Sequence, residues 1–138
     1  TGGHSIFTYD AGSTSWQALT ANSTVKPLDG IWIYSTASTS VSLTYKNDHL
    51  ATPPTKAMYA GWNSIGFSDV NPAAAKDTLQ SVQSQWTQLI GYNGASQYYE
   101  TSIIKGGSGS HSDTNPMNPF KGYWLFMNAP GTLAAISA

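Results

Sequence analysis

One strand-like sequence occurs twice in this chain, and the duplication limits the folds that the chain can adopt. Ile-Trp-Ile-Tyr at residues 31–34 reappears as Tyr-Trp-Leu-Phe at residues 123–126, each directly after a glycine. Repeated aromatic strands of this kind are typical of modular β architectures rather than of a single catalytic centre. We therefore expect one β-rich domain over residues 1–138, made of two degenerate repeats at about 6–46 and 57–138.

Short apolar runs separated by turn residues predict antiparallel strands. The run at residues 6–9 is followed by Asp-Ala-Gly-Ser at residues 10–13, which predicts a β-hairpin. Apolar and polar residues alternate at residues 41–45, and residues 62–67 form another strand-like run. Asn93-Gly94 predicts a second hairpin with a type I′ turn.

The two repeats are unequal, because the first has no counterpart of the strand at 62–67 or of the segment after it. Either those elements lie upstream of residue 1 in a longer chain, or the first repeat pairs against the 62–67 strand. The second arrangement predicts a stable isolated domain, because an unpaired apolar edge tends to aggregate.

One segment, near residues 72–90, has the pattern of a helix. Asn71 can cap it and Pro72 suits the first helical position. Apolar residues then recur three and four positions apart, at Ala75, Leu79, Val82, Trp86 and Leu89 or Ile90. The predicted fold is mainly β, an antiparallel sheet, sandwich or barrel-like structure of two related units, with one α-helix near 72–90.

Composition excludes several classes of function. Charged residues make up only 9% of the chain, against about 25% in an average protein. A net charge of −1, with six lysines and no arginine, offers no basic surface for nucleic acid. Cysteine is absent, which excludes disulfides, thiolate chemistry and cysteine zinc sites. Apolar runs are too short to span a bilayer, so we expect membrane contact only through regions outside this chain.

The sequence Gly-Trp-Asn-Ser-Ile-Gly at residues 61–66, together with Lys-Gly-Tyr-Trp-Leu-Phe at 121–126, resembles a repeat module of secreted and cell-surface proteins from archaea, notably methanogens, and from some bacteria. The resemblance covers 57–138 well and 6–46 as a divergent copy. Ser64 and the Asp-Gly-Ile at 29–31 depart from the commoner forms of the module. The resemblance implies an extracellular, S-layer-associated context and brings no catalytic residues.

Aromatic residues beside the predicted turns are candidates for ligand binding. Trp16, Tyr98 and Tyr99 occupy such positions, where an exposed ring can stack against the C–H groups of a sugar. Trp32 and Trp124, inside the repeated strands, are expected mainly to fill a core shared by the two units, with a ligand platform as the alternative.

Two polar candidates lie near the end of the chain. Asp113, Asn115 and Asn118 carry side-chain oxygens at short intervals, which indicates either a calcium loop or a series of Asx turns. His111 and Asp113 form the other candidate, a small hydrolase centre, if a serine lies within hydrogen-bond reach of His111.

Taken together, the sequence predicts a non-enzymatic extracellular module of an S-layer-associated or adhesin-like cell-surface protein, acting in assembly or adhesion. Its expected partners are neighbouring surface-protein modules or surface glycans. The alternative is a carbohydrate-binding module that uses exposed aromatics, with calcium as a possible aid, and the third hypothesis is the hydrolase. The exposure of Trp16, Tyr98 and Tyr99 separates the first two hypotheses.

Overall fold

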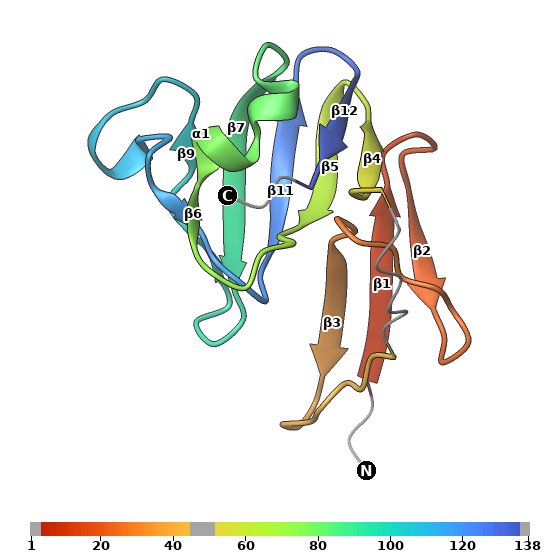
Figure 1. Ribbon diagram of the computed structural model, residues 1–138. Coiled ribbons are helices and arrows are strands. Elements are labelled where there is room, and N and C mark those ends of the chain that lie inside the picture. Colours follow the sequence, from red (N-terminus) through yellow and green to blue (C-terminus); the bar gives the residue numbers. More distant parts are fainter. Residues whose placement is uncertain (1–3, 45–51, 136–138) are drawn as a thin grey trace.

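The computed structural model describes residues 4–44 and 52–135, and it is built from short antiparallel strands with little helix (Figure 1). The prediction of a mainly β fold is therefore confirmed. Two sheets carry most of the structure. A three-stranded sheet contains the N-terminal strands, and a five-stranded sheet is built from strands between Gly61 and Met127.

The N-terminal sheet has the strand order β2-β1-β3. Strands β1 (His4–Asp10) and β2 (Ser15–Leu19) form the predicted hairpin, and β3 (Ile31–Ser35) pairs with the other side of β1. The turn of the hairpin is held by the Asp10 carboxylate, which accepts hydrogen bonds from the Gly12 N–H at 2.9 Å and the Ser13 hydroxyl at 2.7 Å. Asp10 therefore fixes the hairpin through local hydrogen bonding, as Asp commonly does in turns.

The main sheet has the order β5-β11-β7-β8, and β9 also pairs with β7. Its strands are β5 (Gly61–Gly66), β11 (Gly122–Met127), β7 (Trp86–Asn93), β8 (Tyr98–Tyr99) and β9 (Ile103–Ile104). All pairings in it are antiparallel. The repeated sequence at 123–126 thus lies in β11, a central strand paired on both sides.

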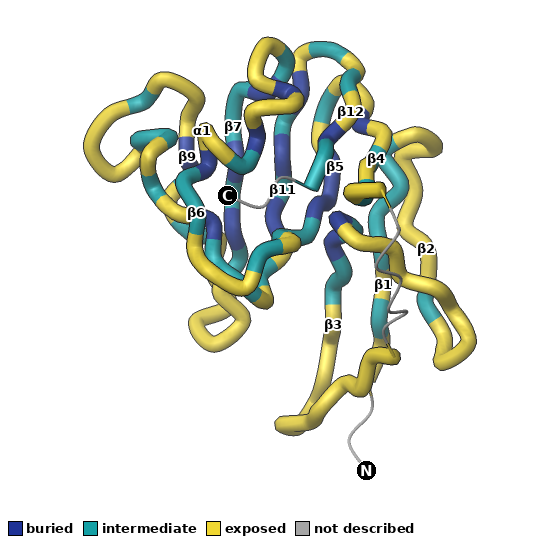
Figure 2. Tube along the Cα trace, viewed as in Figure 1, coloured by how far each residue is buried: buried dark blue, intermediate teal, exposed yellow. Residues whose placement is uncertain are grey.

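The hydrophobic core lies on one face of the main sheet. Ile65, Leu89 and Leu125 point into it and are at most 1% exposed. Figures 1 and 2 show this face covered by the remaining elements, with the buried positions between them. The covering elements are β4 (Thr55–Met58), β12 (Gly131–Ala134), β6 (Ala73–Ala74), β10 (Pro116–Met117), the one-turn helix α1 (Ala75–Thr78) and the 3₁₀ helix η1 (Gln80–Val82). A second 3₁₀ turn, η2 (Gly109–His111), lies in the loop after β9.

The two sheets are joined where the chain enters β3. Gly66 donates its N–H to the Leu28 carbonyl at 2.8 Å, and Asp29 forms an isolated bridge with Ile65 of β5. Gly30 lies so close to β5 that an added Cβ would be 2.3 Å from the Ser64 hydroxyl oxygen. The segment before β3 therefore meets β5, the strand that contains Trp62, through this bridge and hydrogen bond and not through a continuous strand ladder.

The expected helix near 72–90 is much shorter in the structure. The α-helix covers only Ala75–Thr78, Ala74 precedes it without a side-chain cap, and residues from Trp86 onward form β7. The register of β7 against β11 shifts between Phe126 and Met127, and this bulge turns both Trp86 and Leu89 toward the core. A strand with a bulge thereby reproduces the three-residue spacing of a helix.

Two smaller predictions also need correction. Residues 41–44 form no strand, and Val41 and Leu43 are exposed; Tyr45 lies outside the described residues. The hairpin between β7 and β8 exists, but its loop comprises residues 94–97 rather than two residues. The Asn93 side-chain oxygen accepts hydrogen bonds from the N–H groups of Ala95 at 3.0 Å and Ser96 at 3.2 Å, so Asn93 organises the turn from its start.

Candidate functional site

A continuous cluster of aromatic rings lies where the two sheets meet. Each ring in it contacts at least one other, with centroids 5.1–6.4 Å apart. We refer to these residues as the aromatic cluster: Tyr9, Trp16, Trp32, Tyr92, Tyr99 and Trp124.

Strand register places half of the cluster on one face of the N-terminal sheet. Tyr9 is directly opposite Trp16 in the β1–β2 pair, and Phe7 is opposite Trp32 in the β1–β3 pair. Residues opposite each other in antiparallel strands share a face, and so do alternate residues along one strand. Tyr9, Trp16 and Trp32 therefore project from the same side, where the Tyr9 and Trp16 rings meet edge to face at 5.3 Å.

The main sheet supplies the other half from the face opposite the core. Trp124 alternates along β11 with the buried Tyr123 and Leu125, so its ring points away from the core. It meets Tyr9 at 5.2 Å and Trp16 at 5.8 Å. These contacts make the cluster the main hydrophobic connection between the two sheets on this side.

The cluster is only partly covered by protein. Trp16 is 52% exposed and Tyr99 is 59% exposed, and these two rings flank the half-buried Trp32 at 6.3 and 6.4 Å. Among the residues that the structure describes, no hydroxyl or indole N–H of the cluster has a hydrogen-bond partner. The cluster thus offers water-accessible ring surface together with unused polar groups.

The structure brings together two of the three aromatic residues predicted as ligand-binding. Trp16 and Tyr99 both belong to the cluster and are linked through Trp32. Tyr98 does not belong to it: it is opposite Asn93 in the β7–β8 pair, whereas Tyr99 is opposite Tyr92, so consecutive tyrosines point to opposite faces. Tyr98 is 75% exposed and has no ring contact with any described residue.

Sequence reasoning missed Tyr9 and Tyr92 as members of the cluster. The alternation of Phe7 and Tyr9 along β1 was a usable signal, because it puts both rings on one face. Trp32 and Trp124 do contact each other, at 5.9 Å. They nevertheless remain half-buried and stand outside the main core, so they contribute to the exposed surface as well.

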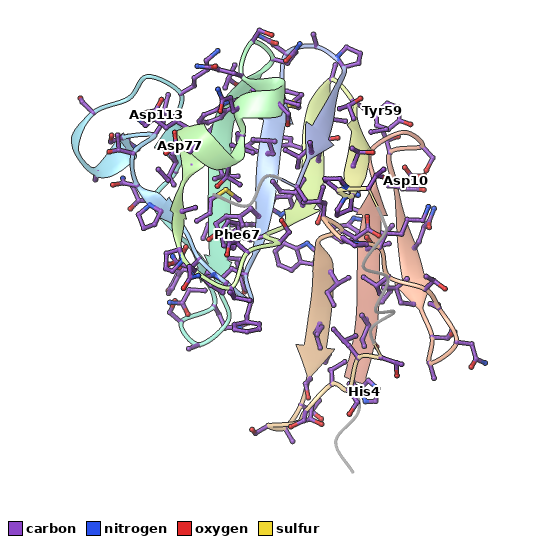
Figure 3. All side chains as sticks on the ribbon, in the orientation of Figure 1. His4, Asp10, Tyr59, Phe67, Asp77 and Asp113 are labelled. Atoms are coloured by element: carbon purple, nitrogen blue, oxygen red, sulfur yellow. The ribbon has the colours of Figure 1, made fainter. Side chains whose placement is uncertain are left out.

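The residues considered for calcium lie in the loop around β10, far from the Asp10 side of the molecule (Figure 3). The Asp113 carboxylate accepts the Gly106 N–H at 2.8 Å, and the Asn115 side chain donates to the Ser110 carbonyl at 2.9 Å. Asn118 donates its backbone N–H to the Tyr123 hydroxyl at 2.7 Å. Over the described residues, no three His, Asp or Glu side chains gather where they could hold a metal ion. The side chains of Asp113 and Asn115 thus stabilise the loop.

A serine does lie near His111, as the hydrolase hypothesis requires. The Ser102 hydroxyl is 3.4 Å from Nδ1 of His111, but the Ser102 carbonyl oxygen is closer, at 2.7 Å from the same nitrogen. A carbonyl oxygen only accepts hydrogen bonds, so Nδ1 of the neutral ring carries the hydrogen. That nitrogen then has no lone pair with which to take a proton from Ser102, and this geometry provides no serine–histidine dyad.

Charge near the cluster is balanced. Lys121 pairs with Glu100, which directly follows Tyr99 in the chain. Because the Lys121 ammonium and the Glu100 carboxylate neutralise each other, neither adds an unpaired charge at the Tyr99 end of the cluster.

In the described part of the chain, no helix is long and apolar enough to cross a membrane. Comparisons of the chain with protein-family models, with curated proteins and with solved structures find no match. The resemblance of residues 57–138 to a cell-surface repeat module therefore stays a prediction.

Proposed function

We propose that this chain is a non-enzymatic module that binds neutral glycans through the aromatic cluster and acts in adhesion at a cell surface. The observation that carries the proposal is the pair of half-exposed rings, Trp16 and Tyr99, joined through Trp32 into one surface. Aromatic side chains that are exposed at this level and grouped in one patch commonly mark a binding site.

The chemistry of the cluster suits a sugar better than an apolar ligand. The axial C–H groups of a pyranose form an apolar patch that packs against an aromatic ring, while its hydroxyls need hydrogen-bond partners. The unused indole N–H and phenol groups of the cluster can supply such partners. Side chains of this amphipathic kind bind with little loss of conformational entropy, because they have only two rotatable bonds.

The electrostatics favour a neutral ligand. The Lys121–Glu100 pair is internally compensated, and charged residues amount to 9% of the whole chain. Lys121 is paired with Glu100 and so is not free to bind the carboxylates of an acidic polysaccharide. The free-energy cost of desolvating those carboxylates would therefore not be offset at this end of the site. We therefore expect uncharged polysaccharides to bind more tightly than uronic-acid polymers.

The cell-surface setting is supported by sequence features rather than by geometry. The chain has no cysteine, few charges, and the aromatic Gly-Trp-Asn and Gly-Tyr-Trp strands that resemble secreted modules. An adhesion module needs a ligand-binding surface and no catalytic centre. The aromatic cluster fits that requirement, and the arrangement of His111 and Ser102 gives no reason to add a hydrolytic activity.

Tryptophan fluorescence tests the proposal directly, because three of the five tryptophans, Trp16, Trp32 and Trp124, lie in the cluster. The purified chain is titrated with neutral and acidic polysaccharides, with acrylamide as a quencher and with or without calcium. A saturable blue shift and reduced quenching with a neutral glycan are the expected results. A flat response to every glycan, or an equal response to any added polymer, would refute the proposal.

A further inference from the structure

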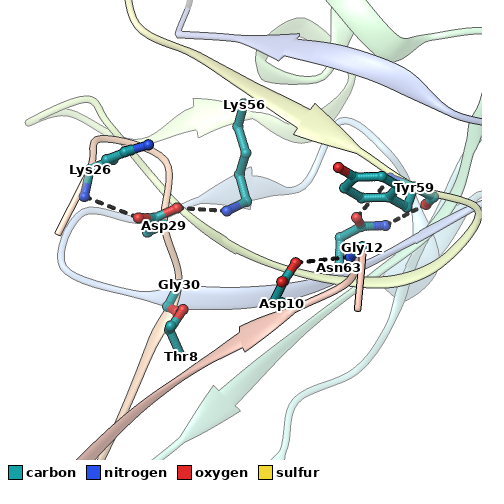
Figure 4. A network of polar contacts seen from close by, with 9 residues as sticks. All are labelled: Thr8, Asp10, Gly12, Lys26, Asp29, Gly30, Lys56, Tyr59 and Asn63. Atoms are coloured by element: carbon teal, nitrogen blue, oxygen red, sulfur yellow. Dashed lines mark hydrogen bonds and ion pairs between the residues drawn. The ribbon is translucent and has the colours of Figure 1, made fainter. Parts of the chain in front are cut away.

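A polar cleft of about 320 Å³ lies on the other side of the β1–β2 hairpin from the aromatic cluster. Asp10 and Gln17 line it, and they alternate along their strands with Tyr9 and Trp16 of the cluster. Strand β4 and the segments before β3 and β5 supply the opposite wall. The residues that carry the argument are Gln17 and five that Figure 4 labels, namely Asp10, Lys26, Asp29, Lys56 and Tyr59.

The two carboxylates of the cleft are held in place without a ligand. Asp29 accepts Lys56 Nζ at 2.6 Å through one oxygen and the Lys26 backbone N–H at 3.0 Å through the other. Asp10 is fixed by the Ser13 hydroxyl and the Gly12 N–H, and these two hydrogen bonds hold its pKa below the ordinary value. Groups that are oriented before binding lose little entropy when a ligand arrives.

One wall of the cleft is an aromatic ring. Tyr59 is 44% exposed and lies over Gly12, where an added Cβ would be only 2.9 Å from the ring. The buried Asn63 side chain accepts the Tyr59 N–H at 3.0 Å and donates to its carbonyl at 2.8 Å. The backbone of Tyr59 is thereby fixed while part of its ring remains open to solvent. Figure 3 shows Tyr59 and Asp10 on the same side of the molecule.

The cleft also contains donors that the protein leaves available. Among the described residues, the Lys26 ammonium has no ion-pair partner. The Gln17 amide makes only a long contact of 3.5 Å with Asp10. Two lysines and two aspartates line the cleft, so their formal charges cancel and a net-charged ligand gains no overall attraction.

We propose that this cleft is a second binding site, which takes a single neutral polyhydroxylated residue such as a monosaccharide. Its volume lies at the lower end of the range for small-molecule sites, about 300–1,000 Å³. The carboxylate of Asp10 can accept from ligand hydroxyls, Lys26 and Gln17 can donate to them, and Tyr59 can pack against the sugar ring. This site shares no binding residue with the aromatic cluster except the neighbouring Tyr9, and it does not depend on the proposed adhesion function.

Nuclear magnetic resonance of the ¹⁵N-labelled chain tests the second site. The titrants are methyl glucoside, methyl mannoside, galactose and N-acetylglucosamine, with glycine as a small zwitterionic control that carries no hydroxyl groups. At least one sugar is expected to shift the backbone amide signals of Asp10, Gly12, Gln17 and Lys26 saturably, with a dissociation constant in the millimolar range. Glycine is expected to leave them unchanged.

Variants separate this site from the aromatic cluster. Asp10→Asn keeps an acceptor for the turn, and Lys26→Gln removes an unpaired charge, so both are expected to fold and to bind the sugar about tenfold more weakly, a loss of 1.4 kcal/mol. Lys76→Gln, a lysine outside the cleft, is the matched control and should bind as the wild type does. The proposal is overturned if no sugar shifts these amides, if glycine shifts them equally, or if Asp10→Asn and Lys26→Gln bind normally.

Discussion

Trp32 and Trp124, which occupy corresponding positions in the two repeated strand sequences, contact each other at the junction of the two sheets. Their ring centroids are 5.9 Å apart and their planes are inclined by 38°. The two similar stretches of sequence therefore meet in space through their tryptophans. Because the rings are half-buried, the same contact both joins the sheets and contributes surface to the aromatic cluster.

Replacement of Trp124 by alanine should destabilise the protein. Trp124 contacts Tyr9, Trp16 and Trp32, so its removal leaves a gap between the sheets. We expect a loss of about 2–3 kcal/mol in the free energy of unfolding, somewhat less than for a fully buried tryptophan. Urea denaturation followed by circular dichroism measures it. Tyr98→Ala is the control, with a change within about 0.5 kcal/mol; equal losses in both variants would contradict the role assigned to Trp124.

Replacement of Gly30 by alanine should disturb the connection between the sheets. A Cβ at this position would be 2.3 Å from the Ser64 hydroxyl oxygen and 2.8 Å from the Ile65 backbone nitrogen. The backbone of β5 would have to move, at a cost of about 1–3 kcal/mol. Gly94→Ala is the matched control, because nothing lies within 4 Å of a Cβ added there. Similar melting temperatures for Gly30→Ala and wild type would argue against the close approach.

Alkaline pH should destabilise the fold through Tyr123. Burial raises the pKa of its hydroxyl, which also accepts the Asn118 N–H at 2.7 Å. A group whose pKa is raised by folding contributes its full stability below the unfolded pKa, about 10 for tyrosine, and loses it as the pH rises through the folded value. Unfolding free energies between about pH 9 and pH 11 should therefore fall less steeply for Tyr123→Phe than for wild type. Parallel slopes would contradict the assignment.

Calcium should leave the stability of the protein unchanged. The Asp113 carboxylate and the Asn115 amide are both engaged with backbone groups of their own loop. A calcium site needs about six to eight oxygen ligands, and Asp113 is the one carboxylate among the three candidate residues. Thermal unfolding in calcium and in a chelator should give the same midpoint. A calcium-dependent rise that Asp113→Asn abolishes would show that the loop binds the ion.

The fold was predictable where local chemistry decides it. The turn at Asp10 specifies the first hairpin, and the two similar strings with a tryptophan two residues after a glycine specify β3 and β11. The segment from Trp86 to Leu89 was predicted to be helical, because the bulge in β7 turns both side chains toward the core and so gives a helix-like spacing. Only the pairing of β7 with β11 shows that the segment is a strand. No single-sequence pattern distinguishes such a strand from a short amphipathic helix.

The candidate site was predictable only in part, for a similar reason. Trp16, Tyr98 and Tyr99 were predicted as ligand-binding residues because they lie beside predicted turns. Which of two consecutive tyrosines joins the cluster depends on the register that sets Tyr99 opposite Tyr92. The contacts of Tyr9 and Trp16 with Trp124 join two sheets, so they arise from tertiary packing that no local pattern encodes.

The most direct test of glycan binding compares Tyr99→Ala with Tyr98→Ala by isothermal titration calorimetry. The two residues are adjacent in sequence, identical in type and both exposed, but only Tyr99 belongs to the aromatic cluster. With the neutral glycan that binds wild type most tightly, we predict about a tenfold loss of affinity for Tyr99→Ala, equivalent to 1.4 kcal/mol, and wild-type affinity for Tyr98→Ala. Equal affinities for the two variants would contradict the assignment of the aromatic cluster as the glycan-binding site.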